Sequence, residues 1–156
     1  MGGGRDDGDK TVASNRKARH DYEIVEQFEA GIQLTGDEVK SLRGGRASLV
    51  DCYARVHGGE AWLEGMHIPA YEQGDTKKHQ PLRPRKLLLH RDEIEHLHAE
   101  IREKGHSVVP LRVYFTHGLA KVELGLGRGK RRHEKRQAIA KREAQREIER
   151  AAGRRR

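Results

Sequence analysis

Cysteine, aromatic residues and long apolar runs are all scarce in this sequence. The one cysteine, Cys52, cannot form a disulfide within a single chain, which favours a reducing compartment. The opening residues lack the apolar segment of a secretory signal, and no stretch approaches the roughly 20 apolar residues that span a bilayer. We therefore expect a monomeric, cytoplasmic protein that does not bind membranes.

The charge is divided unevenly between the body of the chain and its C-terminal end. Residues 127–156 hold 13 Lys and Arg against 4 Asp and Glu, a net charge of +9, whereas residues 1–126 hold 19 against 20. A near-neutral body with a cationic tail indicates a folded module that carries an arm for a polyanion. Because the tail has no Trp, Phe or Leu to insert into a membrane, nucleic acid is the favoured polyanion.

This pattern predicts three segments. We expect residues 1–13, rich in Gly and Asp, to be a disordered extension, residues 14–126 to be a barrel that binds RNA, and residues 127–156 to be a basic tail. The tail has neither Gly nor Pro between Lys130 and Ala152, and its composition favours a helix. Alone it should be disordered because its cations repel each other, and a polyanion would allow the helix to form.

Short strands dominate the predicted body. Alternating apolar residues predict strands near 22–34, 48–57, 61–68, 107–115 and 119–126, with turns at Gly58-Gly59 and His117-Gly118. We expect Val50 and Cys52 to share one face of their strand, with Cys52 a core residue, and Val109 and Leu111 to point inward. Helices are predicted over 37–43 and 92–104. The pattern indicates a mainly β fold, a small closed barrel of the oligonucleotide-binding type with about five to seven strands and one or two short helices.

No motif in the sequence indicates catalysis or a cofactor. The stretch from Gly125 to Lys130 differs from a phosphate-binding P-loop in its glycine spacing and lacks the hydroxyl that follows the lysine, so we interpret it as a flexible hinge. The ten histidines show no metal-ligand spacing, and Cys52 in an alternating strand is typical of a core residue. We therefore expect no metal, no cofactor and no enzymatic activity.

Basic residues in the body form three clusters: Arg16/Lys17/Arg19/His20, Lys40/Arg43/Arg46 and Arg83/Arg85/Lys86. Each alone is typical of solvated surface charge. If the fold gathers them on one side, the body becomes a polarised platform for RNA. Because the few aromatic rings fall within strand patterns, recognition of shape and phosphate backbone is favoured over base stacking.

Several motifs in order resemble the SsrA-binding protein (small protein B) family: Phe28-Glu-Ala-Gly-Ile32, Gly36-Asp-Glu-Val-Lys-Ser-Leu-Arg43, Arg85-Lys-Leu-Leu-Leu-His90, Lys121-Val-Glu-Leu-Gly125 and Gly129-Lys-Arg-Arg-His-Glu-Lys-Arg136. The resemblance implies an oligonucleotide-binding-type barrel that holds the tRNA-like domain of transfer-messenger RNA (tmRNA) and brings it to stalled ribosomes. It also implies a basic tail that folds as a helix in the empty mRNA channel, while the nascent peptide is tagged for proteolysis.

The resemblance also assigns contact residues by motif position. For the tRNA-like domain it implies Glu29 and Leu88, with the neighbours Asn15, Arg19, His20, Lys40 and Lys121. For the ribosome it implies the start of the tail, at Lys130, Arg131, His133, Lys135 and Arg136. A carboxylate such as Glu29 can accept hydrogen bonds from base amino groups or a 2′-hydroxyl, or orient an arginine. The residues alone would equally suit a plain surface acid.

Two other functions fit the same residues less specifically. A structural ribosomal protein would also combine a globular body with a basic extension threaded into rRNA. An RNA-modifying enzyme or nuclease would need an acidic metal cluster or a cofactor loop, and the sequence has no convincing example of either. The number of copies bound per ribosome separates the first alternative from a delivery factor, and turnover of RNA would reveal the second.

Overall fold

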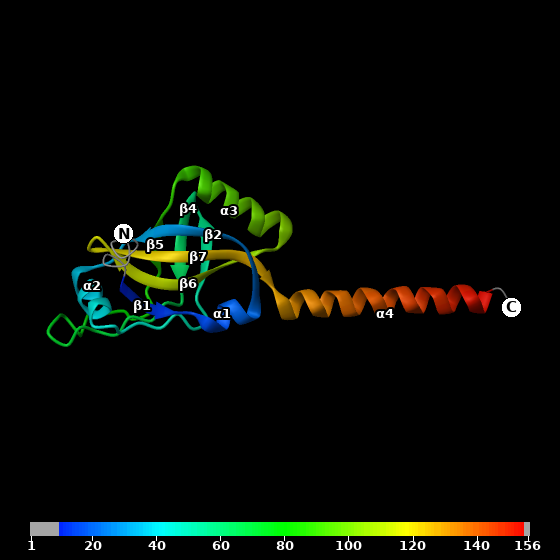
Figure 1. Ribbon diagram of the computed structural model, residues 1–156, viewed down its shortest axis with the longest axis horizontal. Helices are drawn as coiled ribbons and strands as arrows, with labels where there is room; N and C mark the ends of the chain where they lie inside the picture. The colour runs from blue at the N-terminus through cyan, green and yellow to red at the C-terminus, as the bar shows by residue number, and fades with distance from the viewer. Residues whose placement is uncertain (1–9, 155–156) are drawn as a thin grey trace, which may run out of the picture.

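The computed structural model describes residues 10–154 and, within the last helix, the side chains of Lys130, Ile139 and residues 141–153. Seven strands and three short helices form the body, and a long helix follows (Figure 1). The strands are β1 (Lys10–Ser14), β2 (Tyr22–Ile32), β3 (Tyr53–His57), β4 (Glu60–Glu64), β5 (Arg85–Leu88), β6 (Ser107–Thr116) and β7 (Leu119–Gly129). The helices are α1 (Arg16–Asp21), α2 (Gly36–Arg43), α3 (Arg91–Lys104) and α4 (Lys130–Arg154).

The antiparallel sheet closes on itself. Its order is β1-β6-β3-β4-β5-β2-β7, and β6 also pairs with β7, so that β1 alone lies outside a closed ring. Strand β6 can take three partners because β3 pairs with it at Val108, whereas β1 pairs further along the same edge, from Arg112 to Phe115. Closure removes the free strand edges that an open sheet would expose. The predicted small β-barrel is therefore confirmed.

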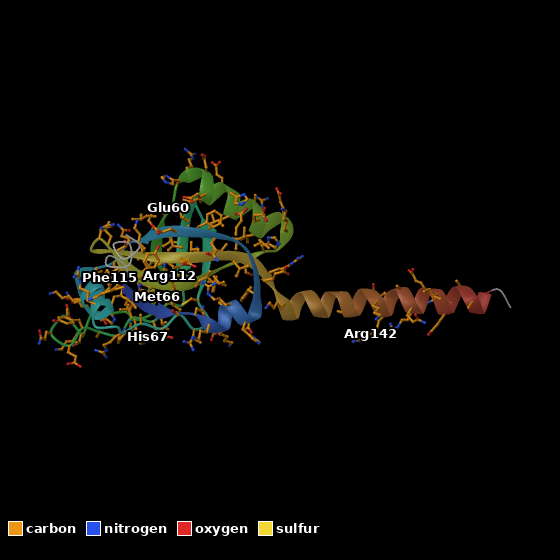
Figure 2. All side chains as sticks on the ribbon, viewed as in Figure 1. Glu60, Met66, His67, Arg112, Phe115 and Arg142 are labelled. Atoms are coloured by element: carbon orange, nitrogen blue, oxygen red, sulfur yellow. The ribbon has the colours of Figure 1, made fainter. Side chains whose placement is uncertain are left out.

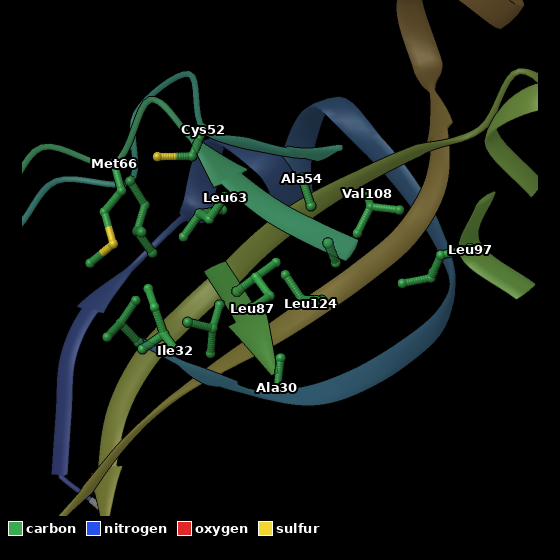
Figure 3. Close-up of a cluster of buried hydrophobic side chains, with 14 of the residues drawn as sticks. Ala30, Ile32, Cys52, Ala54, Leu63, Met66, Leu87, Leu97, Val108 and Leu124 are labelled. Atoms are coloured by element: carbon green, nitrogen blue, oxygen red, sulfur yellow. The ribbon is translucent and has the colours of Figure 1, made fainter. Parts of the chain in front are cut away.

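Apolar side chains from every barrel strand meet inside the ring (Figure 3). Leu63, Leu87 and Leu124 come from three different strands and are fully buried. Leu97 of α3 joins the same cluster, and α3 lies across the barrel in Figure 1. Burying one such leucine contributes about 1.5–3 kcal/mol, and Ile94 and Ile101 of α3 pack against the same cluster.

A second, smaller apolar cluster lies under α1. Val109 and Leu111 pack there with Ala18 of α1, and not inside the barrel as the alternation predicted. A bulge in β6 between Pro110 and Arg112 shifts the alternation, after which Val113 faces the barrel interior. The bulge therefore leaves an apolar surface on the outside of the sheet, and α1 packs on it.

Two expectations about the first half of the chain are wrong. Residues 10–13 were assigned to the disordered extension, but they form β1 with Ser14; residues 1–9 of that extension lie outside the described residues. The predicted strand over 48–57 begins only at Tyr53, because Asp51 has a φ of 61° that a strand cannot contain. Val50 is therefore 59% exposed, whereas Cys52 is buried as expected.

The glycines before the tail do not form a hinge. Gly125 and Gly127 lie inside β7 and pair with Gln27 and Ile24 of β2. A Cβ at Gly127 would lie 2.1 Å from the carbonyl oxygen of Glu23, so the neighbouring backbone occupies the space a side chain would need. These glycines allow the backbones of β2 and β7 to approach closely. The sequence analysis interpreted the same glycines as a source of backbone flexibility.

Helix α4 begins at Lys130, immediately where β7 ends, and includes the stretch from Lys130 to Ala152 whose composition favoured a helix. It extends away from the barrel as a single rod (Figure 1). Its 25 residues correspond to about 37 Å at the usual rise per residue. The described side chains of residues 141–153 are exposed, so the barrel buries none of them.

Candidate nucleic-acid interface

The outer face of the barrel carries a continuous row of side chains across four strands. The register places Leu88 of β5 opposite Gly31 of β2, Gly31 opposite Lys121 of β7, and Lys121 opposite Tyr114 of β6. In a neighbouring row, Glu29 lies opposite Glu123, and Glu123 lies opposite Arg112. Residues opposite each other in an antiparallel sheet share a face, so distant segments meet on one surface.

Glu29 is held by two neighbours from this face. The hydroxyl of Tyr114 donates a hydrogen bond to Oε2, and Nζ of Lys121 lies 4.0 Å from Oε1. The Glu29 side chain is nevertheless 58% exposed. The carboxylate therefore remains able to accept hydrogen bonds from a ligand, as the sequence expectation for this residue requires.

Glu123 joins two arginines beside Glu29. Nε of Arg112 donates to one carboxylate oxygen of Glu123 at 2.8 Å, and Nη2 of Arg19 donates to the other at 3.0 Å. Arg112 also stacks on the ring of Tyr114, with its guanidinium carbon 4.0 Å from the ring centroid. Figure 2 labels Arg112 on the barrel surface. Arg19, Glu29 and Lys121, predicted separately, are thus brought onto one face.

Leu88 presents an apolar side chain at the edge of this face. It is 53% exposed, whereas its neighbour Leu87 on the same strand is buried. Its partner Gly31 explains its position, because a Cβ at residue 31 would lie only 3.2 Å from the Cβ of Leu88. The glycine leaves room for Leu88 to lie over the backbone of β2, with Lys121 on the other side of Gly31.

Asn15 and His20 lie at the two ends of α1. Asn15 is buried and caps the helix: its Oδ1 accepts from the Ala18 amide at 3.1 Å, while Nδ2 donates to the carbonyls of Leu49 and Pro110. These bonds occupy its amide within the protein, so Asn15 positions α1 and with it Arg19. His20 is exposed, with Nδ1 3.0 Å from Oδ1 of Asp21.

Lys40 is not in contact with this group among the described residues. It lies on α2 with its ammonium 5.4 Å from the ring centroid of Tyr71, in the long loop before β5. Arg43, one turn further along α2, stacks on Phe115 at 5.3 Å. Phe115 is the last residue but one of β6, so α2 lies near the end of the strand that carries Tyr114.

The third basic cluster does not form a phosphate-binding surface. Arg85 is completely buried, with Nε 2.7 Å from Oε2 of Glu38 on α2. Arg83 binds the other oxygen of Glu38. Burial alone would raise the pKa of Glu38, but hydrogen bonds from Arg83, the Thr35 amide and Arg85 outweigh it and hold the pKa below its usual value. Sequence reasoning missed this pair because both partners look like ordinary surface charges.

The residues expected to contact the ribosome lie on the first turns of α4. Lys130 is exposed at the helix start. Arg131, His133, Lys135 and Arg136 follow on the same helix, and their side chains lie outside the described residues. Their backbone places them where the barrel ends and the isolated rod begins (Figure 1).

Tyr114, Arg112 and Glu123 were not predicted as site residues, although the pattern contained a signal. The alternation in the second half of β6 and in β7 points all three outward. A tyrosine that is only 3% exposed on an outer face must be covered by neighbouring side chains, and here Arg112 covers it.

Within residues 10–154, apart from the undescribed side chains, no cluster of three His, Cys, Asp or Glu could hold a metal. The described helices include none long and apolar enough to cross a bilayer.

Comparisons with known proteins agree on one family. A family model described as SmpB protein matches residues 12–154. The SsrA-binding protein of Salinispora tropica is 61% identical over 151 residues, covering 97% of this chain and 95% of the relative. That of Thermobifida fusca is 60% identical, covering 96% and 93%. A solved structure described as "tmRNA-SmpB: a journey to the center of the bacterial ribosome" matches with a TM-score of 0.64 and 50% identity, covering 76% of this chain and 83% of that one.

Proposed function

Because the chain belongs to the SmpB family, we propose that it binds the tRNA-like domain of tmRNA and delivers the RNA to stalled ribosomes for trans-translation. The observation that carries the proposal is the shared outer face of Glu29, Lys121 and Arg19, with Leu88 at its edge. Three regions of the sequence contribute to it: the consecutive elements α1 and β2, strand β5 and strand β7. Such convergence on one exposed face is typical of a binding surface.

The chemistry of this face suits a folded RNA. The Glu29 carboxylate is a hydrogen-bond acceptor. It is repelled by phosphates, but it can accept hydrogen bonds from base amino groups or 2′-hydroxyls. Arg19 and Lys121 supply cations for the phosphate backbone beside it. Leu88 adds an apolar contact for a sugar or base. The face therefore combines specific and non-specific RNA contacts within one network.

The tail suits a different partner. Helix α4 is rich in Lys and Arg, and its described side chains at residues 141–153 are exposed on a rod that extends away from the barrel (Figure 1). A cationic rod of this length fits a passage lined by RNA, such as the mRNA channel of a ribosome without a complete message. In this division the barrel holds tmRNA, and Lys130, Arg131, His133, Lys135 and Arg136 begin the contact with the ribosome.

We propose that the protein acts by binding in the cytoplasm and catalyses no reaction. Cys52 cannot serve as a nucleophile while it is buried, because burial raises its pKa to about 12. The protein's task would be to hold two RNAs in a fixed geometry, with the chemistry of peptide transfer left to the ribosome.

The test compares the full chain with a variant that ends at Gly129. We expect both to bind the isolated tRNA-like domain with similar affinity in a filter-binding assay. Only the full chain should support tagging of a nascent peptide on ribosomes stalled at the end of a message without a stop codon. Loss of RNA binding by the truncated barrel would contradict this division of labour.

The number of copies bound per ribosome separates a delivery factor from a structural ribosomal protein. A delivery factor should be present in far fewer copies than ribosomes and should leave them in high salt. One copy per ribosome that survives high-salt washing would instead support a structural role.

A further inference from the structure

Tyr114 has an unusual environment for a residue on the outer face of a barrel. It is 3% exposed, and the guanidinium of Arg112 covers its ring at 4.0 Å from the centroid. Its hydroxyl nevertheless reaches Oε2 of Glu29 two strands away, across β7. The ring is therefore fixed from one side while the polar end is directed at an exposed carboxylate.

Arg112 is itself held rigidly. Its Nε donates to Glu123 at 2.8 Å, and its Nη1 donates to the hydroxyl of Thr11 at 3.3 Å. The guanidinium is thus anchored at two points on β7 and β1 while it stacks on Tyr114. A planar guanidinium that is hydrogen-bonded to two partners restricts the ring beneath it more than a single apolar contact would.

An unrestrained glutamate on a protein surface loses side-chain entropy when a ligand fixes it. That cost is larger for a side chain with several rotatable bonds. In the free protein the Tyr114 hydroxyl already holds one oxygen of Glu29, and Lys121 lies near the other. The carboxylate is therefore oriented before RNA arrives, and the loss on binding is smaller.

We propose that Tyr114 is a positioning residue for RNA recognition, which acts by holding the Glu29 carboxylate in its binding orientation. The inference rests on the proposed function, because it requires Glu29 to contact the tRNA-like domain. Arg112 and Glu123 support Tyr114, and Glu123 also fixes Arg19 at 3.0 Å. One network thus presents both an acceptor and a cation to the RNA.

The test is a double-mutant cycle in the full chain, with variants Tyr114→Phe, Glu29→Gln and the pair. Affinity for the isolated tRNA-like domain is measured for each. We expect Tyr114→Phe to weaken binding by up to about tenfold, because Glu29 must then be ordered as the RNA binds. In the Glu29→Gln background the same change should have much less effect, because the carboxylate it orients is gone.

A matched control and a second readout separate positioning from a general structural role. Tyr53→Phe, a half-exposed tyrosine on β3, should leave affinity unchanged. Tyr114→Phe should also leave the salt dependence of binding unchanged, whereas Lys121→Ala should lower its slope by about one. A changed slope for Tyr114→Phe would indicate a disturbed surface and overturn the inference.

The possible failures are distinguishable. If the wild-type chain does not bind the tRNA-like domain, the proposed function fails and the inference fails with it. If the wild-type chain binds and Tyr114→Phe has no effect, or has the same effect with and without Glu29, only the positioning role is overturned.

Discussion

Glu38 and Arg85 form an ion pair inside the protein, with residue exposures of 2% and 0%. Arg85 also donates to the carbonyls of Met66 and Pro81, so it ties α2 to the segment before the long loop and to the loop itself. Glu38 belongs to the capping box of α2, in which it accepts from the Thr35 amide at 2.9 Å. The pair therefore sets the position of the helix that carries Lys40.

Replacing Arg85 should destabilise the protein strongly. Arg85→Met retains much of the side-chain volume but leaves Glu38 buried with Arg83 as its remaining cation. Breaking a buried pair from one side costs about 3–5 kcal/mol, because the remaining charge is poorly solvated. Urea denaturation measures the change in the free energy of unfolding. Arg102→Met, at an exposed position on α3, should change it by less than about 0.5 kcal/mol.

The stability of the protein should depend on Glu38 in acid. Its pKa is lower in the folded state than its ordinary value of 4.5, so the folded protein binds the proton less readily than the unfolded chain. The stabilisation from this group is therefore complete above pH 4.5 and is lost as the pH falls through the lower folded pKa. Denaturation at a series of pH values should show this fall, and Glu38→Gln should reduce it. Equal acid dependence in both proteins would assign the effect to other carboxylates.

The sequence predicted the β-barrel well where apolar residues alternate and glycines mark a turn. The hairpin of β3 and β4 at Gly58-Gly59 is an example, with both glycines at positive φ. Helix α1 was not predicted, because its six residues contain only one buried side chain, Ala18. The inward direction of Val109 was also wrong, since one bulge in β6 reverses the alternation. Local pattern cannot reveal a shift that tertiary packing selects.

The candidate site was less predictable than the fold. Glu29 and Leu88 came from motif resemblance, and nothing in local sequence distinguishes Glu29 from other surface acids. Its contact with Tyr114 depends on the register of β2, β7 and β6, which joins residues far apart in the chain. Tyr114 itself looked like one more residue of an alternating strand. Sequence therefore supplied residues of the site but not the network that connects them.

A side chain at Gly127 should disturb the junction of β2 and β7. The Cβ in Gly127→Ala would lie 2.1 Å from the backbone oxygen of Glu23, which cannot rotate away. Overpacking of this kind costs about 1–3 kcal/mol. The matched control is Gly36→Ala in the first turn of α2, where a Cβ meets nothing within 4 Å. Thermal unfolding should show a lower midpoint for the first variant alone, and equal midpoints would contradict the packing explanation.

The thiol of Cys52 should be inert in the folded protein. Burial raises its pKa to about 12, so the reactive thiolate is almost absent at pH 8 and the sulfur is covered. We expect negligible alkylation by iodoacetamide under native conditions and rapid alkylation in urea, where the thiol regains a pKa of about 8.5. Mass spectrometry measures both. Fast native alkylation would mean that the loop before β3 opens readily.

Removal of α4 should leave the stability of the barrel unchanged. The described side chains of residues 141–153 are exposed, and the helix extends away from the sheet in Figure 1. A variant that ends at Gly129 keeps every strand of the closed ring, including the pairing of Gly129 with Tyr22. Because unfolding free energy follows buried apolar surface, the urea midpoint should shift by no more than the equivalent of about 0.5 kcal/mol. A loss above about 1 kcal/mol would show that the tail packs on the barrel in solution. Its arginines would then be engaged by the protein itself, and the tail could not enter an RNA-lined channel without first being released.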